Sequence, residues 1–219
     1  MPPRRVRNLL ALAVLSYLSR QPMHPYELGR TLRANADERS IKFTHGSLYM
    51  VVGQLEKAGF VVAEGTGREG RRPERTVYAI TDAGRAELHD WLRELVEEPQ
   101  HEYPSFVAAL SLIGALPPSQ VLTLLGRRLE RLAEVRAETA AARDQALGQG
   151  VPGLFLVEEE YRIALLDAEL AFVRRFVEQI VDPDNGWGRQ WAEFHNEPDP
   201  AKPKNAQPQD AQSPEGKQS

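Results

Sequence analysis

Apolar residues recur at helical spacing in three short segments at the start of the chain. The first segment predicts a helix over residues 8–19, with Asn8 as its N-cap. The third predicts a helix over residues 46–58, capped by Thr44 and ended by Gly59. Between them, a second helix is predicted from the spacing of Pro25, Tyr26, Leu28, Leu32 and Ala36.

Two short runs rich in β-branched and aromatic residues follow, at residues 60–63 and 76–80. The segment between them holds three glycines and four arginines, which predicts the loop of a β-hairpin. Thr81 is a candidate cap for a further helix that ends near Pro99. Three helices, a hairpin and another helix follow one another in the order of a winged helix-turn-helix.

The residues after Pro99 are predicted to form three helices followed by a tail. A short helix is predicted over residues 106–116, a long one after Pro117-Pro118-Ser119, and a final one over residues 154–181. The last two helices carry coiled-coil-like apolar rows, which need a partner surface and predict a dimerisation region. The expected fold class is therefore mainly α: a winged helix-turn-helix of three helices plus a β-hairpin wing, followed by a long-helix dimerisation region. The expected dimer contacts are Leu122, Leu125, Leu129, Leu132, Tyr161, Leu165, Phe172 and Phe176.

From residue 182 the chain is rich in Pro, Asn, Gln and Asp, which predicts a disordered tail. Trp187, Trp191 and Phe194 lie between the last helix and this tail, and they are candidates to fold back onto the helices.

Composition narrows the class of protein. The 219 residues are 42% hydrophobic and 26% charged, as in ordinary globular proteins. The absence of cysteine excludes disulfides and thiolate metal sites and fits a cytoplasmic protein. The apolar stretch 9–18 follows Arg4, Arg5 and Arg7, but it is too short to cross a bilayer and has no small-residue cleavage site after it. We therefore expect no membrane partner.

Charge is distributed unevenly along a chain whose net charge is −4. Residues 1–90 hold 14 Lys and Arg against 10 Asp and Glu, whereas the remainder holds 13 against 21. The basic excess lies in the predicted winged helix-turn-helix. This makes the N-terminal part the candidate for binding a polyanion such as DNA.

The third predicted helix and the hairpin loop carry the candidate DNA contacts. The apolar row of the helix faces inward, which leaves polar residues at its start and on its outer face, where they can meet phosphates and base edges. The hairpin arginines would lie along the phosphates or in the minor groove. A solvated helix face and a solvated hairpin tip are the alternatives. The candidates are Thr44, His45, Ser47, Tyr49, Met50, Gln54, Arg68, Arg71, Arg72 and Arg75.

Several stretches together resemble the PadR-like transcriptional regulators, over about residues 8–180. The matching stretches are residues 26–28 (Tyr-Glu-Leu), 46–49 (Gly-Ser-Leu-Tyr), 55–59 (Leu-Glu-Lys-Ala-Gly), 71–81 (Arg-Arg-Pro-Glu-Arg-Thr-Val-Tyr-Ala-Ile-Thr) and Gly84. The chain is similar to the branch with a long helical C-terminal domain, although Met50 stands where family members usually carry proline. The resemblance implies a homodimer, typically a repressor, that binds a pseudo-palindromic promoter site.

The resemblance also implies a ligand in some members, where a small planar aromatic compound binds near a tryptophan of the helix after the wing. Trp91 matches that tryptophan, and Phe106 is a weaker candidate. The alternative for Trp91 is simple packing in a core or a dimer contact. The expected organisation is a DNA-binding domain over residues 1–98, a helical dimerisation domain that would also hold an effector over residues 99–182, and a partly ordered to disordered tail over residues 183–219.

Two other classes of protein remain to be weighed. The five histidines show no paired metal-ligand spacing, and no nucleophile-elbow or phosphate-loop motif is present, so we expect neither an enzyme nor a metal or other cofactor. A winged-helix adaptor that binds only proteins is the alternative function. Four arginines on one hairpin favour DNA over an adaptor, because they suit phosphate neutralisation.

Overall fold

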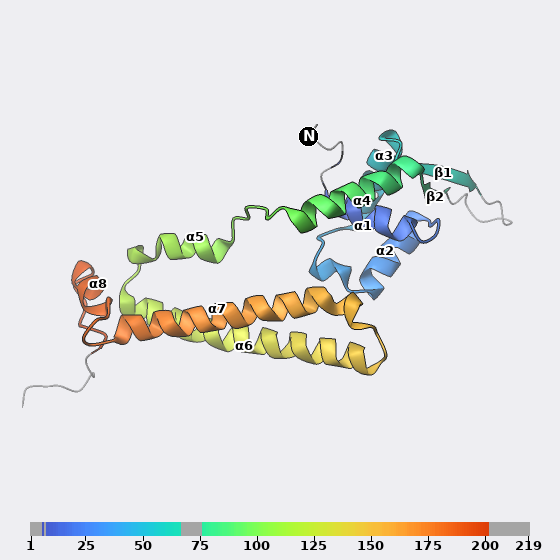
Figure 1. The fold of residues 1–219 in the computed structure, drawn as a ribbon. Helices are drawn as coiled ribbons and strands as arrows, with labels where there is room; N and C mark the ends of the chain where they lie inside the picture. The colour runs from blue at the N-terminus through green and yellow to red at the C-terminus, as the bar shows by residue number, and fades with distance from the viewer. Residues whose placement is uncertain (1–5, 7, 67–75, 202–219) are drawn as a thin grey trace, which may run out of the picture. The chain divides into compact units, whose positions relative to one another are not determined.

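The structure is a computed structural model that describes residue 6, residues 8–66 and residues 76–201. These residues form two compact units, one ending at Glu102 and the other beginning at Tyr103 (Figure 1). Each unit has its own hydrophobic core.

The first unit begins with three helices, as predicted: α1 (Leu9–Leu18), α2 (Pro25–Ala34) and α3 (His45–Lys57). A short 3-10 turn, η1 (Asp37–Arg39), separates α2 from α3, and α4 (Asp82–Glu97) ends the unit. The predicted second helix stops earlier than expected, because Ala36 lies beyond it with a left-handed φ of 58°.

The predicted helix caps are confirmed. The Asn8 side chain accepts a hydrogen bond from the backbone N–H of Leu10, and the Thr81 hydroxyl accepts one from that of Gly84. Each bond satisfies a backbone donor that has no partner inside the helix. Gly59 follows α3 with a φ of +81°, a conformation that glycine adopts without steric cost.

The hairpin consists of β1 (Val61–Thr66) and β2 (Thr76–Ile80), paired antiparallel with Val61 opposite Ile80. Its base is tied to both flanks. The backbone N–H of Phe60 donates to the carbonyl of Leu55 in α3, and Met23 exchanges two backbone hydrogen bonds with Tyr78. The wing therefore starts from a fixed position beside α3 and the α1–α2 turn.

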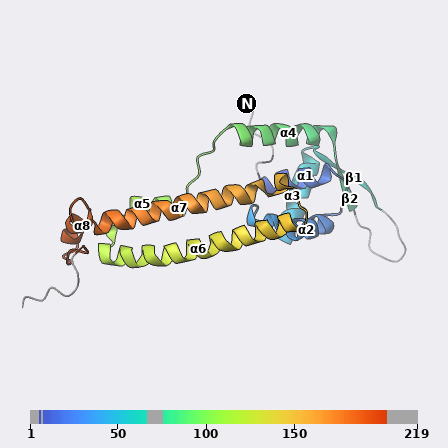
Figure 2. The ribbon, with the colours of Figure 1, turned by 60° about the horizontal axis from the view of Figure 1, so that its bottom comes forward.

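The second unit is a helical hairpin. It runs through α5 (Ser105–Ser111), η2 (Ile113–Ala115), α6 (Pro118–Gly148), η3 (Gly153–Leu156), α7 (Val157–Val181) and α8 (Gly188–Phe194). Figure 2 shows α6 and α7 running side by side along their length. The expected mainly α fold, with a small hairpin and long C-terminal helices, is confirmed.

The core of the second unit lies between α6 and α7 at the end where α5 and α8 also pack. Val121 and Leu125 of α6 are buried against Val173, Phe176 and Ile180 of α7. Ion pairs add contacts along the hairpin: Arg128 with Glu169, and Arg136 with Asp167. Such partly exposed pairs contribute less than the apolar core.

Residues 182–201 begin the segment predicted as a partly ordered to disordered tail, and the structure describes a helix there, α8. Asp182 accepts hydrogen bonds from the N–H groups of Asp184 and Asn185, which lowers its pKa. Trp191 of α8 packs on the second core and donates from its indole nitrogen to the carbonyl of Leu116, at 2.9 Å. This aromatic anchor outweighs the loop-like composition around it.

Among the described residues, no helix combines the length and apolar character needed to span a membrane.

Candidate nucleic-acid interface

The inner face of α3 fixes this helix in the first unit. Its apolar row consists of Leu48, Val51, Val52 and Leu55, and none of these residues is more than 1% exposed. The burial of four branched side chains leaves α3 little freedom to rotate. Its outer face is therefore held in one orientation.

The outer face of α3 has two residues without a side chain. Gly46, Met50, Gly53 and Lys57 follow one another at steps of four, three and four residues, so they lie on one line along the helix. Met50 is 56% exposed. Apart from the chain neighbours and the backbone of α3 itself, no atom of the described residues lies within 4 Å of the place where a Cβ would stand at Gly46 or Gly53. We call these four residues the outer strip; its two glycines leave the backbone open to close approach.

An aromatic cluster flanks the outer strip and joins the starts of α2 and α3. The ring centroids of His45 and Tyr49 are 4.8 Å apart, and those of Tyr26 and His45 are 6.3 Å apart. His24 packs edge-on to Tyr49 and caps α2 through its Nδ1. Two helix N-termini, whose free amides favour anions, thus lie beside one another.

Tyr26 was not predicted as part of this surface. Its place in the apolar series of the second helix is wrong, because its side chain is 51% exposed. At 100° per residue, Tyr26 lies about 160° around α2 from the buried Leu28, which was a signal available in the sequence. The hydroxyl-bearing ring is therefore a further candidate contact.

Two of the predicted DNA contacts have structural roles. Thr44 and Ser47 form a capping box: the Thr44 hydroxyl accepts from the N–H of Ser47, and the Ser47 hydroxyl accepts from the N–H of Thr44 at 2.8 Å. These bonds begin α3 at a defined residue. Gln54 is exposed, on the opposite side of the outer strip from Tyr49.

The predicted wing arginines, Arg68, Arg71, Arg72 and Arg75, lie outside the described residues, as do Arg4, Arg5 and Arg7. The structure brings together Thr44, His45, Ser47, Tyr49, Met50 and Gln54 on one exposed side of the first unit.

The candidate effector residues lie in different units. Trp91 is 5% exposed and belongs to the core of the first unit. Phe106 of α5 is half-buried and lines an apolar groove of the second unit. Within the described ranges, no group of three or more His, Asp or Glu side chains is arranged to hold a metal ion.

The candidate dimer contacts divide into two groups. Leu125 and Phe176 are buried inside the chain, and Leu122, Leu129 and Leu132 are half-buried. The remaining three, Tyr161, Leu165 and Phe172, are exposed on α7.

Three helices and a wing, with an exposed third helix whose start is rich in hydrogen-bonding groups, define the winged helix-turn-helix class of DNA-binding domains. Residues 14–90 match the model of the Transcriptional regulator PadR-like family, so this part of the chain is similar to that family.

Two curated relatives are similar to the chain in sequence. Over 86 residues, 37% of this chain and 42% of the relative, the chain is 37% identical to the "Probable transcriptional regulator Rv1176c" of Mycobacterium tuberculosis. The matched part thus spans less than half of that relative. Over 149 residues, 68% of this chain and 80% of the relative, it is 22% identical to the "Negative transcriptional regulator PadR" of Bacillus subtilis.

Solved structures share the fold over both units. Bacillus subtilis PadR in complex with operator DNA superposes with a TM-score of 0.58 at 20% sequence identity, covering 77% of this chain and 99% of that one. The same protein in complex with p-coumaric acid superposes with a TM-score of 0.57 at 18% sequence identity, covering 76% of this chain and 99% of that one. At these identities the likeness is one of fold.

Proposed function

We propose that this protein is a homodimeric transcriptional regulator, a repressor, that binds a pseudo-palindromic promoter site through α3 and the wing. The observation that carries the proposal is the outer strip of α3. Gly46 is exposed and Gly53 half-buried, and open space where each Cβ would stand lets a helix approach DNA closely. Among the described residues outside α3, no atom would contact a Cβ added at either glycine within 4 Å, so packing within this part of the chain does not account for them.

The side chains around the strip supply the chemistry of recognition. His45, Tyr49 and Gln54 offer hydrogen-bonding groups to base edges, and Met50 offers an apolar contact. The amides at the starts of α2 and α3 favour phosphate. Arg68, Arg71, Arg72 and Arg75 complete the proposal as phosphate or minor-groove contacts of the wing.

The dimer is proposed from α7, which has two apolar faces. Its inner face, including Ile163, Leu170 and Val173, is buried in the hairpin. On the opposite side, Val157, Tyr161, Leu165, Ala168 and Phe172 recur at steps of four, four, three and four residues and are all exposed. We call these five residues the outer stripe of α7. A second copy of the chain would bury this stripe, as in a helix–helix interface.

A small planar aromatic effector that releases the DNA is part of the proposal. Bacillus subtilis PadR has been solved with p-coumaric acid, which supports a ligand in this fold. Of the two candidate residues, Phe106 lies on an open groove, whereas Trp91 is enclosed in its core. A ligand changes the DNA affinity of the protein only to the extent that it binds one conformational state of the protein more tightly than the other.

The test is fluorescence anisotropy of the full chain with the DNA upstream of its own gene, at several salt concentrations. We expect His45→Ala and Gln54→Ala to change which sequence is preferred, and Arg71→Ala with Arg72→Ala to lower the slope of log affinity against log salt by about two. Arg174→Ala on α7 is the matched control and should change neither. Affinity that does not depend on salt, or variants that all bind like the parent, would contradict the proposal and favour an adaptor.

A further inference from the structure

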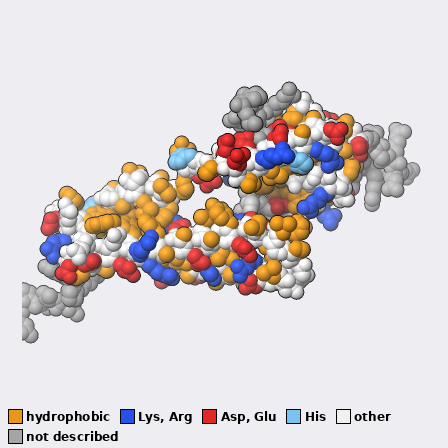
Figure 3. All heavy atoms as spheres, in the orientation of Figure 1, with side chains coloured by type: hydrophobic (Ala, Val, Ile, Leu, Met, Phe, Trp, Pro, Cys, Tyr) orange, Lys and Arg blue, Asp and Glu red, His pale blue; other side chains and the backbone are white. Residues whose placement is uncertain are grey.

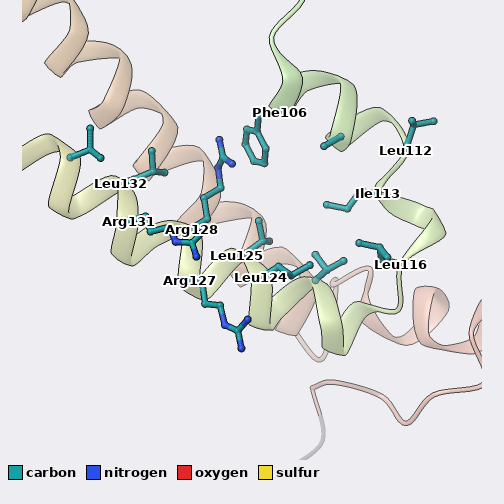
Figure 4. Close-up of a pocket in the computed structure, with 13 residues that line it drawn as sticks. Phe106, Leu112, Ile113, Leu116, Leu124, Leu125, Arg127, Arg128, Arg131 and Leu132 are labelled. Atoms are coloured by element: carbon teal, nitrogen blue, oxygen red, sulfur yellow. The ribbon is translucent and has the colours of Figure 1, made fainter. Parts of the chain in front are cut away.

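A groove lies between α5 and α6 in the second unit. It has a volume of about 650 Å³ and is lined from one side by α5 and η2, and from the other by α6. Figure 4 shows Ile113 and Leu116 facing Leu124 and Leu125 across it. A volume of this size falls in the range of small-molecule sites, roughly 300–1,000 Å³.

The groove is apolar along its length and cationic at one rim. Its α6 wall runs from Val121 to Val135, which spans about 21 Å at 1.5 Å per residue. Arg127, Arg128 and Arg131 also line it. These three arginines form a positively charged group in residues 91–219, a part of the chain in which acidic residues outnumber basic ones.

The three arginines differ in what they already bind. Arg128 is held by Glu169 and lies over the ring of Phe106, with its guanidinium carbon 3.5 Å from the ring centroid (Figure 4). This contact fixes one wall of the groove. By contrast, Arg127 and Arg131 are exposed and make no ion pair within the described part of the chain. Their guanidinium groups remain available to a ligand.

We infer that this groove binds a small amphiphilic carboxylate, with the carboxylate at Arg127 and Arg131 and an extended apolar chain running toward Leu116. An arginine fork matches a carboxylate. The ten residue steps from Val121 to Arg131 cover about 15 Å of helix, which suits a medium-length alkyl chain better than a compact ring.

The ligand would strengthen a weakly held helix. None of the residues of α5 is fully buried, and the helix meets the core only through partly buried side chains such as Phe106 and Leu110. A chain lying between α5 and α6 adds apolar contacts to both. That this would alter DNA binding rests on the proposed function, but binding of the carboxylate itself does not.

The experiment is isothermal titration of the full chain, without DNA, using decanoate as the probe and decanol and trans-cinnamate as comparisons. We expect saturable binding of one decanoate per chain, weaker binding of both comparisons, and loss of affinity at high salt. Arg127→Gln with Arg131→Gln should weaken decanoate about tenfold, because a charge-assisted contact is lost. Ala109→Trp, which fills the groove, should abolish binding, whereas the exposed Arg174→Gln on α7 should leave it unchanged.

Four results of these measurements would contradict the inferred site or show another occupant. Equal binding of decanol and decanoate, or no effect of the two arginine changes, would overturn the carboxylate site. Tighter binding of trans-cinnamate would overturn the extended chain. No binding of decanoate, together with a change from dimer to monomer in Ala109→Trp, would show that a second copy of the chain covers the groove. DNA affinity measured separately on the same variants distinguishes failure of this inference from failure of the proposed function.

Discussion

Gly53 offers the sharpest test of the outer strip, because stability and DNA binding should move in opposite directions. It is the ninth of the 13 residues of α3, well inside the helix, and an added Cβ would meet no atom of the described residues within 4 Å, apart from chain neighbours and the helix backbone. Glycine inside a helix costs about 0.5–1 kcal/mol relative to alanine. Gly53→Ala should therefore raise the free energy of unfolding by about that amount.

The same methyl group would stand on the surface proposed to meet DNA. For a unit of roughly 100 residues, the gain corresponds to an increase in Tm of roughly 2–8 °C. A methyl group forced into a close interface costs about 1–3 kcal/mol, which weakens DNA binding by roughly 5- to 150-fold. Scanning calorimetry measures the first effect, and fluorescence anisotropy measures the second.

Gly126→Ala is the matched control. Gly126 lies inside α6, and a Cβ there also has open space within 4 Å. It should stabilise the chain by a similar amount and leave DNA affinity unchanged. The reasoning is refuted if Gly53→Ala gains stability and binds DNA like the parent, because the outer strip would then be remote from the duplex.

Three further predictions follow from contacts in the two units. Gly84→Ala should lower the free energy of unfolding by about 1–3 kcal/mol, seen as a lower urea midpoint, because its Cβ would press on the carbonyl oxygen of Phe60; an unchanged midpoint would show that the wing base yields easily. Leu165→Glu should raise the dimer dissociation constant about a hundredfold by placing a charge in the outer stripe of α7, as measured by sedimentation equilibrium, whereas Ala171→Glu beside the stripe should change it little. Burial, and then the hydrogen bond that its hydroxyl donates to Asp37, raise the pKa of Tyr17, so its contribution to stability is present below the ordinary pKa of about 10 and is lost as the pH rises through the raised value. Urea unfolding between pH 8 and 11 should show that loss, and a Tyr17→Phe variant with the same pH slope as the parent would argue against it.

The helices and caps of the first unit were predictable because their signals are local. Asn8, Thr44 and Thr81 each bond to a backbone group two or three residues away, so the sequence alone contains both partners. Gly59 likewise ends α3 through its own φ. The predicted DNA contacts on α3 followed from the same local pattern, since the inner row determines the outer face.

What the sequence did not reveal depends on contacts between distant residues. The sequence marks Trp191 as a candidate to fold back onto the helices, but it does not show the acceptor, the carbonyl of Leu116, which lies 75 residues earlier in the chain. The aromatic cluster joins Tyr26 of α2 to His45 of α3. The apolar row of the last helix was read as one surface, although the structure buries Phe176 and leaves Tyr161 exposed. A period of 3.6 residues marks apolar positions but does not say which partner covers each.

α3 and α7 share one design, in which the inner face fixes the helix and the outer face serves a partner. The two outer faces differ in kind: that of α3 combines glycines with polar and aromatic groups, whereas that of α7 is apolar over about four turns. A polyanion requires open backbone and hydrogen-bonding groups, but a second helix requires apolar side chains that it can bury. The inner rows of α3 and α7 already supply the core contacts. The residues of each outer face can therefore suit a partner, at the expense of a small amount of helix stability, as at Gly53. The two partners of the proposed regulator, DNA and a second copy of the chain, are therefore separable by single substitutions.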